Sequence, residues 1–188
     1  MTSQTKAKNL SLYFKKLEEL SVPTEKLKEM YQGNLLNATF TNINDYGNAY
    51  DGSFLEIILR ILTPYAIKIN EILPEEKRVD KDTLVKICLL HQISKCVRLI
   101  PNDNAWEVEK RGMLYKYDPN LPSVRGGLHS LSICQECGIE FTLEEVEAMV
   151  VNDRDLTDDQ YRWHSSILSS IVRQANELTY LTINSKTT

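Results

Sequence analysis

The sequence Leu84-Val85-Lys86-Ile87-Cys88-Leu89-Leu90-His91-Gln92-Ile93-Ser94-Lys95 decides the fold that we predict for this chain. Apolar side chains recur in it three or four positions apart, which is the spacing of one face of an α-helix. This face contains Leu84, Ile87, Cys88 and His91. We therefore expect a buried helix, capped at its start by Asp80 or Asp82, whose histidine points into the core. Lys95 follows one helical turn later.

Helical spacing extends on both sides of this stretch. An amphipathic helix is expected after Lys8, and Thr24 is expected to cap a short second one. The remaining predicted helices run from about Ser53 to Leu73 with a kink at Pro64, from Ser130 to Cys137, from a capping box of Thr142 and Glu145, and from about Asp158 to Thr182. Residues 32 to 52 are rich in Asn, Gly, Thr and Asp, which predicts a long loop over the surface or over a site.

Residues 105 to 117 interrupt the helical pattern. Aromatic and β-branched residues flank Lys110-Arg111-Gly112, so we expect a β-hairpin with the glycine at its turn. The predicted fold class is therefore mainly α: a helical bundle with one small β-hairpin. Trp106, Tyr115 and Tyr117 would either pack across the strands onto the bundle or form a surface that stacks bases or binds a partner.

Length and composition indicate one globular domain over residues 1–188. Hydrophobic residues make up 42% of the chain and charged residues 26%, as in ordinary folded proteins. The net charge of -4, with both signs interspersed, argues against a broad nucleic-acid surface. Met1 to Lys8 is polar, and no apolar run reaches membrane-spanning length, so we expect a cytoplasmic protein without a membrane partner.

The chain has four cysteines, at positions 88, 96, 134 and 137. We expect them to be reduced. Cys134 and Cys137 form a single CxxC pair, which could bind zinc or cycle between thiols and a disulfide. Because no second pair completes four ligands, small buried side chains on one helix face are the favoured interpretation.

The central stretch resembles the signature of the HD phosphohydrolase superfamily, in which an apolar helix carries His-Asp followed three residues later by Lys. His91 and Lys95 match this frame, but Gln92 stands where the family has Asp. Upstream, Gly52-Ser53-Phe54-Leu55-Glu56-Ile57 is similar to the family's Gly-Gly-Leu-Leu-Glu-His segment, which ends in the first metal ligand. Ile57 occupies the position of that histidine.

Two further segments resemble the family in the expected order. Residues 125 to 130, Arg-Gly-Gly-Leu-His-Ser, are similar to its glycine-rich turn, and a Leu-Thr-x-Glu-Glu-like segment follows at Phe141 to Glu145. Near the end, Asn176 occupies the aspartate position of the family's Ala-Asp-x-Leu pattern. The resemblance covers about residues 50 to 181 and implies an HD-domain-like bundle, with residues 1–49 as helices and a loop packed on it.

The substitutions fall on the residues that the family uses to hold its metal. Family members bind a divalent ion through two histidines and two aspartates, and the ion activates water to attack a phosphate ester. Here Ile57 has no donor atom, and Gln92 and Asn176 offer only neutral amide oxygens beside His91. We therefore predict no bound metal and no other cofactor. The resemblance also implies that these four vestigial positions converge around one pocket.

Several other polar residues are candidates for binding. Lys95 could contact a phosphate, or it could lie on a solvated helix face with its stem on apolar surface. Arg125, with two glycines at a helix start, could bind an anion through backbone N–H groups, or it could belong to a plain loop. We expect His129 at a helix-start surface and His164 in packing near an aromatic residue.

Three functions are consistent with these observations. The first is a non-catalytic HD-like domain that binds a small polar ligand or a protein partner. The alternative is an active metal-dependent phosphohydrolase, acting on a nucleotide or other phosphate ester, that recruits His129, Asp153 or Asp155 as replacement ligands. The third is a structural subunit whose helical faces form a homo-oligomer.

Overall fold

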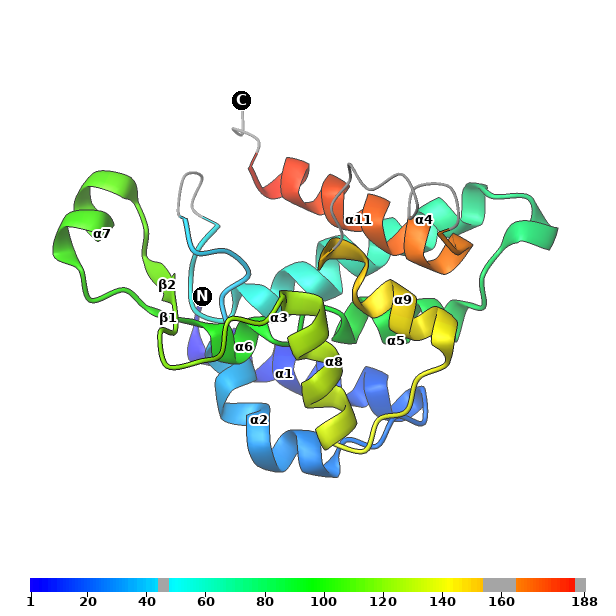
Figure 1. Cartoon of the computed structure of the whole chain (residues 1–188), viewed down its shortest axis with the longest axis horizontal. Coiled ribbons are helices and arrows are strands. Elements are labelled where there is room, and N and C mark those ends of the chain that lie inside the picture. The colour runs from blue at the N-terminus through cyan, green and yellow to red at the C-terminus, as the bar shows by residue number, and fades with distance from the viewer. Residues whose placement is uncertain (44–47, 154–164, 185–188) are drawn as a thin grey trace.

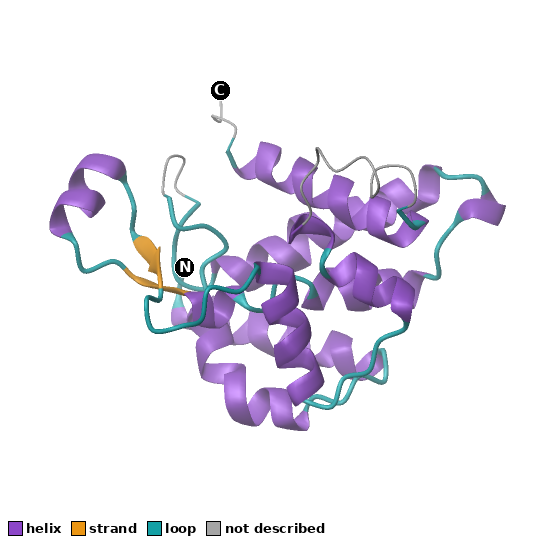
Figure 2. Ribbon diagram, in the orientation of Figure 1, coloured by secondary structure: helices purple, strands orange, loops and turns teal. Residues whose placement is uncertain are grey.

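The computed structural model describes residues 1–43, 48–153 and 165–184. The fold is mainly α with one two-stranded antiparallel hairpin, as predicted (Figures 1 and 2). The helices are α1 Ser3–Glu19, α2 Glu25–Asn37, α3 Ser53–Ile57, α4 Thr63–Ile72, α5 Lys81–Leu90, α6 Lys95–Arg98, α7 Ala105–Arg111, α8 Gly126–Glu136, α9 Leu143–Met149 and α11 Ile167–Ile183. Shorter helical turns are η1 Ile58–Leu62, η2 Glu75–Lys77 and η3 Val151–Asp153, and the strands are β1 Leu99–Pro101 and β2 Tyr115–Tyr117. In the described part of the chain, no helix is long and apolar enough to cross a membrane.

Helix α5 is the centre of the bundle, as its apolar sequence predicts. It contacts α1, α4, α9 and α11, and six of its ten residues are buried. Asp80 caps its start by accepting a hydrogen bond from the Thr83 backbone N–H at 2.8 Å. Buried residues from α1 through α11 join these in one hydrophobic cluster. Burial of this apolar surface is the main source of the fold's stability.

The predicted helix from Ser53 to Leu73 is present but is not uniform. Helix α3 runs into the π-helical turn η1 and then into α4, with the backbone N–H of Thr63 bonded to the carbonyl of Ile58, five residues earlier. Pro64 follows at once and has no N–H to donate. The expected disturbance at Pro64 therefore takes the form of a π-turn directly before it.

Several predicted helix ends differ from those observed. Helix α1 begins at Ser3, because Thr2 caps it, and α8 begins at Gly126 and not at Ser130. Helix α2 continues to Asn37, so the predicted loop is shorter than expected. Thr24 precedes α2, but its hydroxyl bonds the Glu18 carboxylate and does not cap the helix.

Helices α9 and α11 each begin at a side chain that caps them. Thr142 and Glu145 form the predicted capping box. Helix α11 begins at Ile167, where the Ser166 side chain accepts from the Ser169 N–H. The predicted start at Asp158 lies outside the described residues.

The predicted position of the hairpin turn was wrong. Strand β1 pairs with β2, and Leu99 lies opposite Tyr117, but helix α7 fills the connection where strand and turn were expected. The Asn104 side chain accepts hydrogen bonds from two backbone N–H groups and so starts this helix, and Gly112 ends it at φ 61°. Figure 1 shows α7 projecting from the bundle.

The three aromatic residues of this hairpin do not share one surface. Tyr115 is buried, and its hydroxyl donates to Asp51 at 2.6 Å. Trp106 and Tyr117 are 62% and 61% exposed. Packing onto the bundle therefore accounts for Tyr115 alone.

All four cysteines are free and buried. Cys134 lies within α8, and Cys137 follows its last turn. The structure therefore agrees with the interpretation that these are small apolar side chains of the core.

Gly127 marks the closest approach of α8 to the segment that ends α9. A Cβ atom at this position would lie 2.6 Å from the Met149 carbonyl oxygen and 2.8 Å from the Val150 Cα. Both are backbone atoms, which cannot turn aside as a flexible side chain can. Only glycine fits here without moving one helix.

We expect Gly127→Ala to lower the free energy of unfolding by about 1–3 kcal/mol, because the added methyl group overpacks this contact. Gly33→Ala is the matched control, since Gly33 lies within α2 and a Cβ atom added there would meet nothing within 4 Å. The control should raise stability by about 0.5–1 kcal/mol through helix propensity. Urea denaturation of both variants measures the difference, and equal effects would contradict the assigned contact.

Candidate functional site

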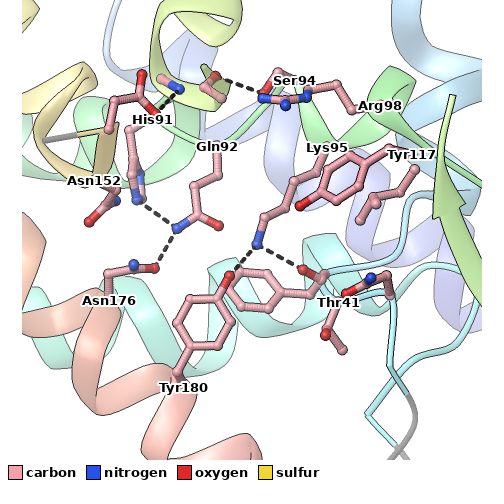
Figure 3. Close-up of a pocket in the computed structure, with 16 residues that line it drawn as sticks. Thr41, His91, Gln92, Ser94, Lys95, Arg98, Tyr117, Asn152, Asn176 and Tyr180 are labelled. Carbon is pink, nitrogen blue, oxygen red and sulfur yellow. Dashed lines mark hydrogen bonds between the residues drawn. The ribbon is translucent and has the colours of Figure 1, made fainter. Parts of the chain in front are cut away.

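A pocket of about 410 Å³ lies beside the corner between α5 and α6 (Figure 3). The N-terminus of α8, the turn η3, helix α11 and the hairpin supply its other walls. Phe40, Thr41 and Asn42 also line it. The polar loop that follows α2 therefore lies over a site, which was one of the two predicted possibilities.

The inner wall of this pocket is a chain of hydrogen bonds. The His91 Nδ1 lies 3.1 Å from the Ile87 carbonyl oxygen, and the Gln92 Nε2 lies 3.1 Å from the His91 Nε2. The Gln92 amide also donates to the Asn176 Oδ1. One assignment of hydrogens satisfies all three contacts: the imidazole donates from Nδ1 and accepts at Nε2.

The His91 imidazole in this wall is neutral. The residue is 1% exposed, and burial lowers the pKa of its imidazole to about 4. The Nε2 lone pair that would face a metal is directed at an amide N–H. The wall therefore carries no charge of its own.

Of the four positions that the family resemblance placed around one pocket, the structure brings three together. His91, Gln92 and Asn176 all line the pocket and bond one another in sequence. Ile57 is buried in the hydrophobic core and does not line the pocket. An isoleucine can pack against apolar neighbours, and this is where the structure places it.

One atom of this wall remains unsatisfied. The Gln92 Oε1 is buried and has no hydrogen-bond partner among the described residues. Since buried acceptors normally have a partner, this oxygen is a place where a donor from a bound molecule would be stabilised. Gln92 as a whole is 7% exposed.

Lys95 is half-buried and its amine is held by protein groups, in contrast to the solvated helix face that was one interpretation of its position. Its Nζ donates to the Phe40 carbonyl at 2.7 Å and to the Tyr180 hydroxyl at 2.8 Å, and it lies 3.6 Å from the centroid of the Phe40 ring. Burial lowers the pKa of this amine well below its usual value. The ring would stabilise an ammonium by about 0.5–2 kcal/mol. Loss of hydration costs an unpaired ion several kcal/mol, so burial dominates.

Arg98 also lines the pocket, and the sequence analysis missed it. Its guanidinium stacks 5.4 Å from the Tyr117 ring and pairs with no described carboxylate. A Cβ at Gly126 would lie 2.9 Å from the Arg98 Nη1, so that glycine makes room for the guanidinium. The sequence did carry a signal for Arg98. It follows Lys95 by three positions, and residues three apart lie on the same face of a helix.

Asp153 occupies the helix start that was one candidate for anion binding. Its carboxylate accepts from the backbone N–H groups of Gly127 at 2.9 Å and Leu128 at 2.8 Å, and so caps α8 from outside the helix. Arg125 is exposed and bonds the Asp153 carbonyl, away from the pocket lining. Of the two interpretations of this helix start, a plain loop or an anion site, the structure matches the second, but the anion is the protein's own carboxylate.

Of the remaining candidates, the structure describes only His129, and His129 does not line the pocket. His129 is half-buried, is not part of the lining, and has its pKa lowered by burial and by Arg98. Asp155 and His164 lie outside the described residues. Within residues 1–43, 48–153 and 165–184, no three His, Cys, Asp or Glu side chains are grouped as a metal site.

No protein-family model matches the chain, and neither a curated protein nor a solved structure is similar to it.

We expect stability to fall as the pH decreases from about 6.5 to about 4, because the unfolded chain binds a proton at His91 before the folded one does. The shift corresponds to a loss of about 3 kcal/mol across this range. Unfolding free energies measured by urea denaturation at several pH values test this. His91→Gln should flatten the dependence.

His129→Gln serves as the matched control, since His129 is outside the hydrogen-bonded chain. This control should keep most of the pH dependence of the natural protein. If both variants behave alike, His91 is not the buried neutral group that titrates.

Proposed function

We propose that this protein is a non-catalytic HD-like domain that has lost its metal site and binds a small anionic ligand in the pocket. One observation carries the proposal: hydrogen bonds join His91, Gln92 and Asn176 in a neutral chain. A divalent cation at this point would face amides and one imidazole, with no carboxylate to offset the cost of its desolvation. We place the protein in the cytoplasm, where its buried thiols remain reduced.

The charge of the pocket favours an anion. Arg98 is a permanent cation without a described carboxylate partner, and Lys95 lies in the same lining. Asp153 is the acidic residue in the lining, and both of its oxygens already accept backbone hydrogen bonds. Gln92 leaves an acceptor for a donor group on the ligand. A cavity of about 410 Å³ has the size of small-molecule sites.

An active phosphohydrolase is the competing proposal, because His91 and Asp153 line the same pocket. For Asp153 to bind a metal, its carboxylate would have to leave the N-terminus of α8. That exchange would expose two backbone N–H groups that it now satisfies. The arrangement therefore favours binding without turnover.

Anion binding should depend on Arg98. We expect inorganic phosphate or glycolate to raise the melting temperature of the natural protein, because both ligands stabilise the folded state. Arg98→Gln should weaken binding by about ten- to a hundredfold, the equivalent of one charge-assisted hydrogen bond. Thermal shift titrations and calorimetry measure both effects.

Arg111→Gln is the control, since Arg111 is an exposed arginine on α7, away from the pocket lining. It should leave the affinity unchanged. If neither anion binds the natural protein, or if both variants weaken binding equally, the pocket is not an anion site.

Restoring the family's ligands should create a metal site. We expect Gln92→Asp and Asn176→Asp, combined with Ile57→His, to bind manganese or nickel, because carboxylates would then flank the retained His91. Each single substitution should do little, since one added carboxylate in a buried wall would remain protonated or destabilise the fold. The double variant without Ile57→His shows whether the core position is needed.

Calorimetry and metal quantitation measure the affinity, with melting temperatures recorded to separate lost binding from lost folding. The natural protein, purified without chelator, should contain less than one equivalent of divalent metal. A full equivalent bound at His91 would support the phosphohydrolase instead. A triple variant that folds but has no metal affinity would contradict the proposal that only the ligand side chains of a metal site were lost.

A further inference from the structure

We propose that Lys95 captures a carbonyl compound, forming an imine with a small aldehyde or 2-oxo acid whose anionic group Arg98 holds. The inference rests on the proposed function and names the class of ligand for the same pocket. Its basis is the contrast between two lysines with closely similar surroundings.

Lys86 provides the comparison within the same molecule. Its Nζ donates to the Glu140 carbonyl at 2.9 Å and lies 4.8 Å from the Phe141 ring, so it also has a carbonyl and an aromatic partner. It differs in its third contact, the Glu145 carboxylate at 2.9 Å. Where Lys86 has this carboxylate, Lys95 has the hydroxyl of Tyr180. Lys95 therefore has no counter-ion where Lys86 has one.

Burial without a counter-ion produces a reactive amine. A lysine removed from water and placed near another cation loses its proton more readily, and the neutral amine is the nucleophile. The titratable and charged side chains that line the pocket beside Lys95 are His91, Arg98, Tyr117, Asp153 and Tyr180. His91 is neutral, Arg98 adds positive charge, and Asp153 is engaged by the α8 backbone. Within this lining, no uncommitted carboxylate opposes the loss of the proton.

The geometry leaves this amine available to a ligand. The Lys95 Nζ makes two hydrogen bonds, to the Phe40 carbonyl and the Tyr180 hydroxyl. Its remaining tetrahedral position, which holds the lone pair of a neutral amine, has no hydrogen-bond partner among the described residues. Lys95 and Arg98 lie three residues apart on α6 and line the same pocket. A carbonyl carbon next to a carboxylate fits this pair, because the guanidinium binds the carboxylate while the amine meets the carbon. The Gln92 Oε1 adds an acceptor in the same wall.

The reaction is a condensation that needs no oxidant or reductant. The lone pair on Nζ adds to the carbonyl carbon, the C=O π bond breaks, and one of the two amine hydrogens moves as a proton to the oxygen, which becomes a hydroxyl. The second amine hydrogen then moves as a proton to this hydroxyl, the C–O bond breaks, and water leaves as the C=N bond forms. Tyr180, whose hydroxyl lies 2.8 Å from Nζ, is placed to carry protons between these atoms. Burial raises the pKa of Tyr180 to about 12, so this hydroxyl holds its proton between transfers.

The test uses glyoxylate as the probe, with cyanoborohydride to reduce any imine to a stable secondary amine. The natural protein is treated at pH 7, and peptide mass spectrometry measures labelling of Lys95, Lys86 and the exposed Lys110 in one sample. We expect Lys95 to react at least about tenfold faster than Lys86, since each unit by which a pKa is lowered gives about tenfold more free amine. Its labelling should saturate with glyoxylate and be inhibited by glycolate, which has the carboxylate but no carbonyl group.

Two variants separate the roles of the neighbours. Tyr180→Phe should slow labelling of Lys95 and change its pH dependence while leaving glycolate binding intact. Arg98→Gln should raise the glyoxylate concentration needed for half-maximal labelling. Melting temperatures confirm that each variant is folded.

The outcomes distinguish this inference from the proposed function. If Lys95 reacts no faster than Lys86 while glycolate still raises the melting temperature, the imine inference is overturned and anion binding stands. If neither glycolate nor phosphate binds and Lys95 is unreactive, both proposals fail. Rapid labelling that glycolate does not inhibit would overturn the role assigned to Arg98.

Discussion

The hydrogen-bonded chain of His91, Gln92 and Asn176 is the contact on which the rest of the site depends. It connects Gln92, just after the end of α5, to Asn176 in α11, 84 positions later in the sequence. Its hydrogen bonds join three neutral side chains, so the wall needs no ion to hold them together. Removing one member would leave its neighbour unsatisfied, which typically costs about 1–3 kcal/mol.

The neutrality of this chain determines the charge of the pocket beside it. With no carboxylate in the inner wall, the charges that matter come from α6 and from Asp153, and Asp153 is directed at the N-terminus of α8. Arg98 and Lys95 thus face a cavity without an uncommitted acid in its described lining. Amides in the inner wall, where carboxylates would favour a cation, leave the pocket suited to anions.

The sequence predicted the helices and their buried faces well, because these depend on local spacing. The stretch around α5, the capping box at Thr142 and the mainly α fold class are examples. The hairpin turn was misplaced because a single capping residue, Asn104, outweighed the β-propensity of the residues that follow it. Local patterns compete, and the sequence alone does not rank them.

The site was predicted only in part, because its remaining contacts join distant segments. No spacing rule relates Phe40 or Tyr180 to Lys95, although both contact its amine. Likewise, nothing near the glycines of α8 indicated that a carboxylate 26 residues later would cap them.

That carboxylate also limits which molecules the helix terminus can attract. Asp153 is tethered to the N–H groups it binds, so a dissolved anion competes with a partner whose effective concentration is set by the fold and not by dilution. Tethered groups commonly correspond to millimolar or higher concentrations. Dilute phosphates and carboxylates are thereby excluded from the end of α8. The Arg98 guanidinium, which lies beside the same helix start, is left as the group that a dissolved anion could reach under the proposed function.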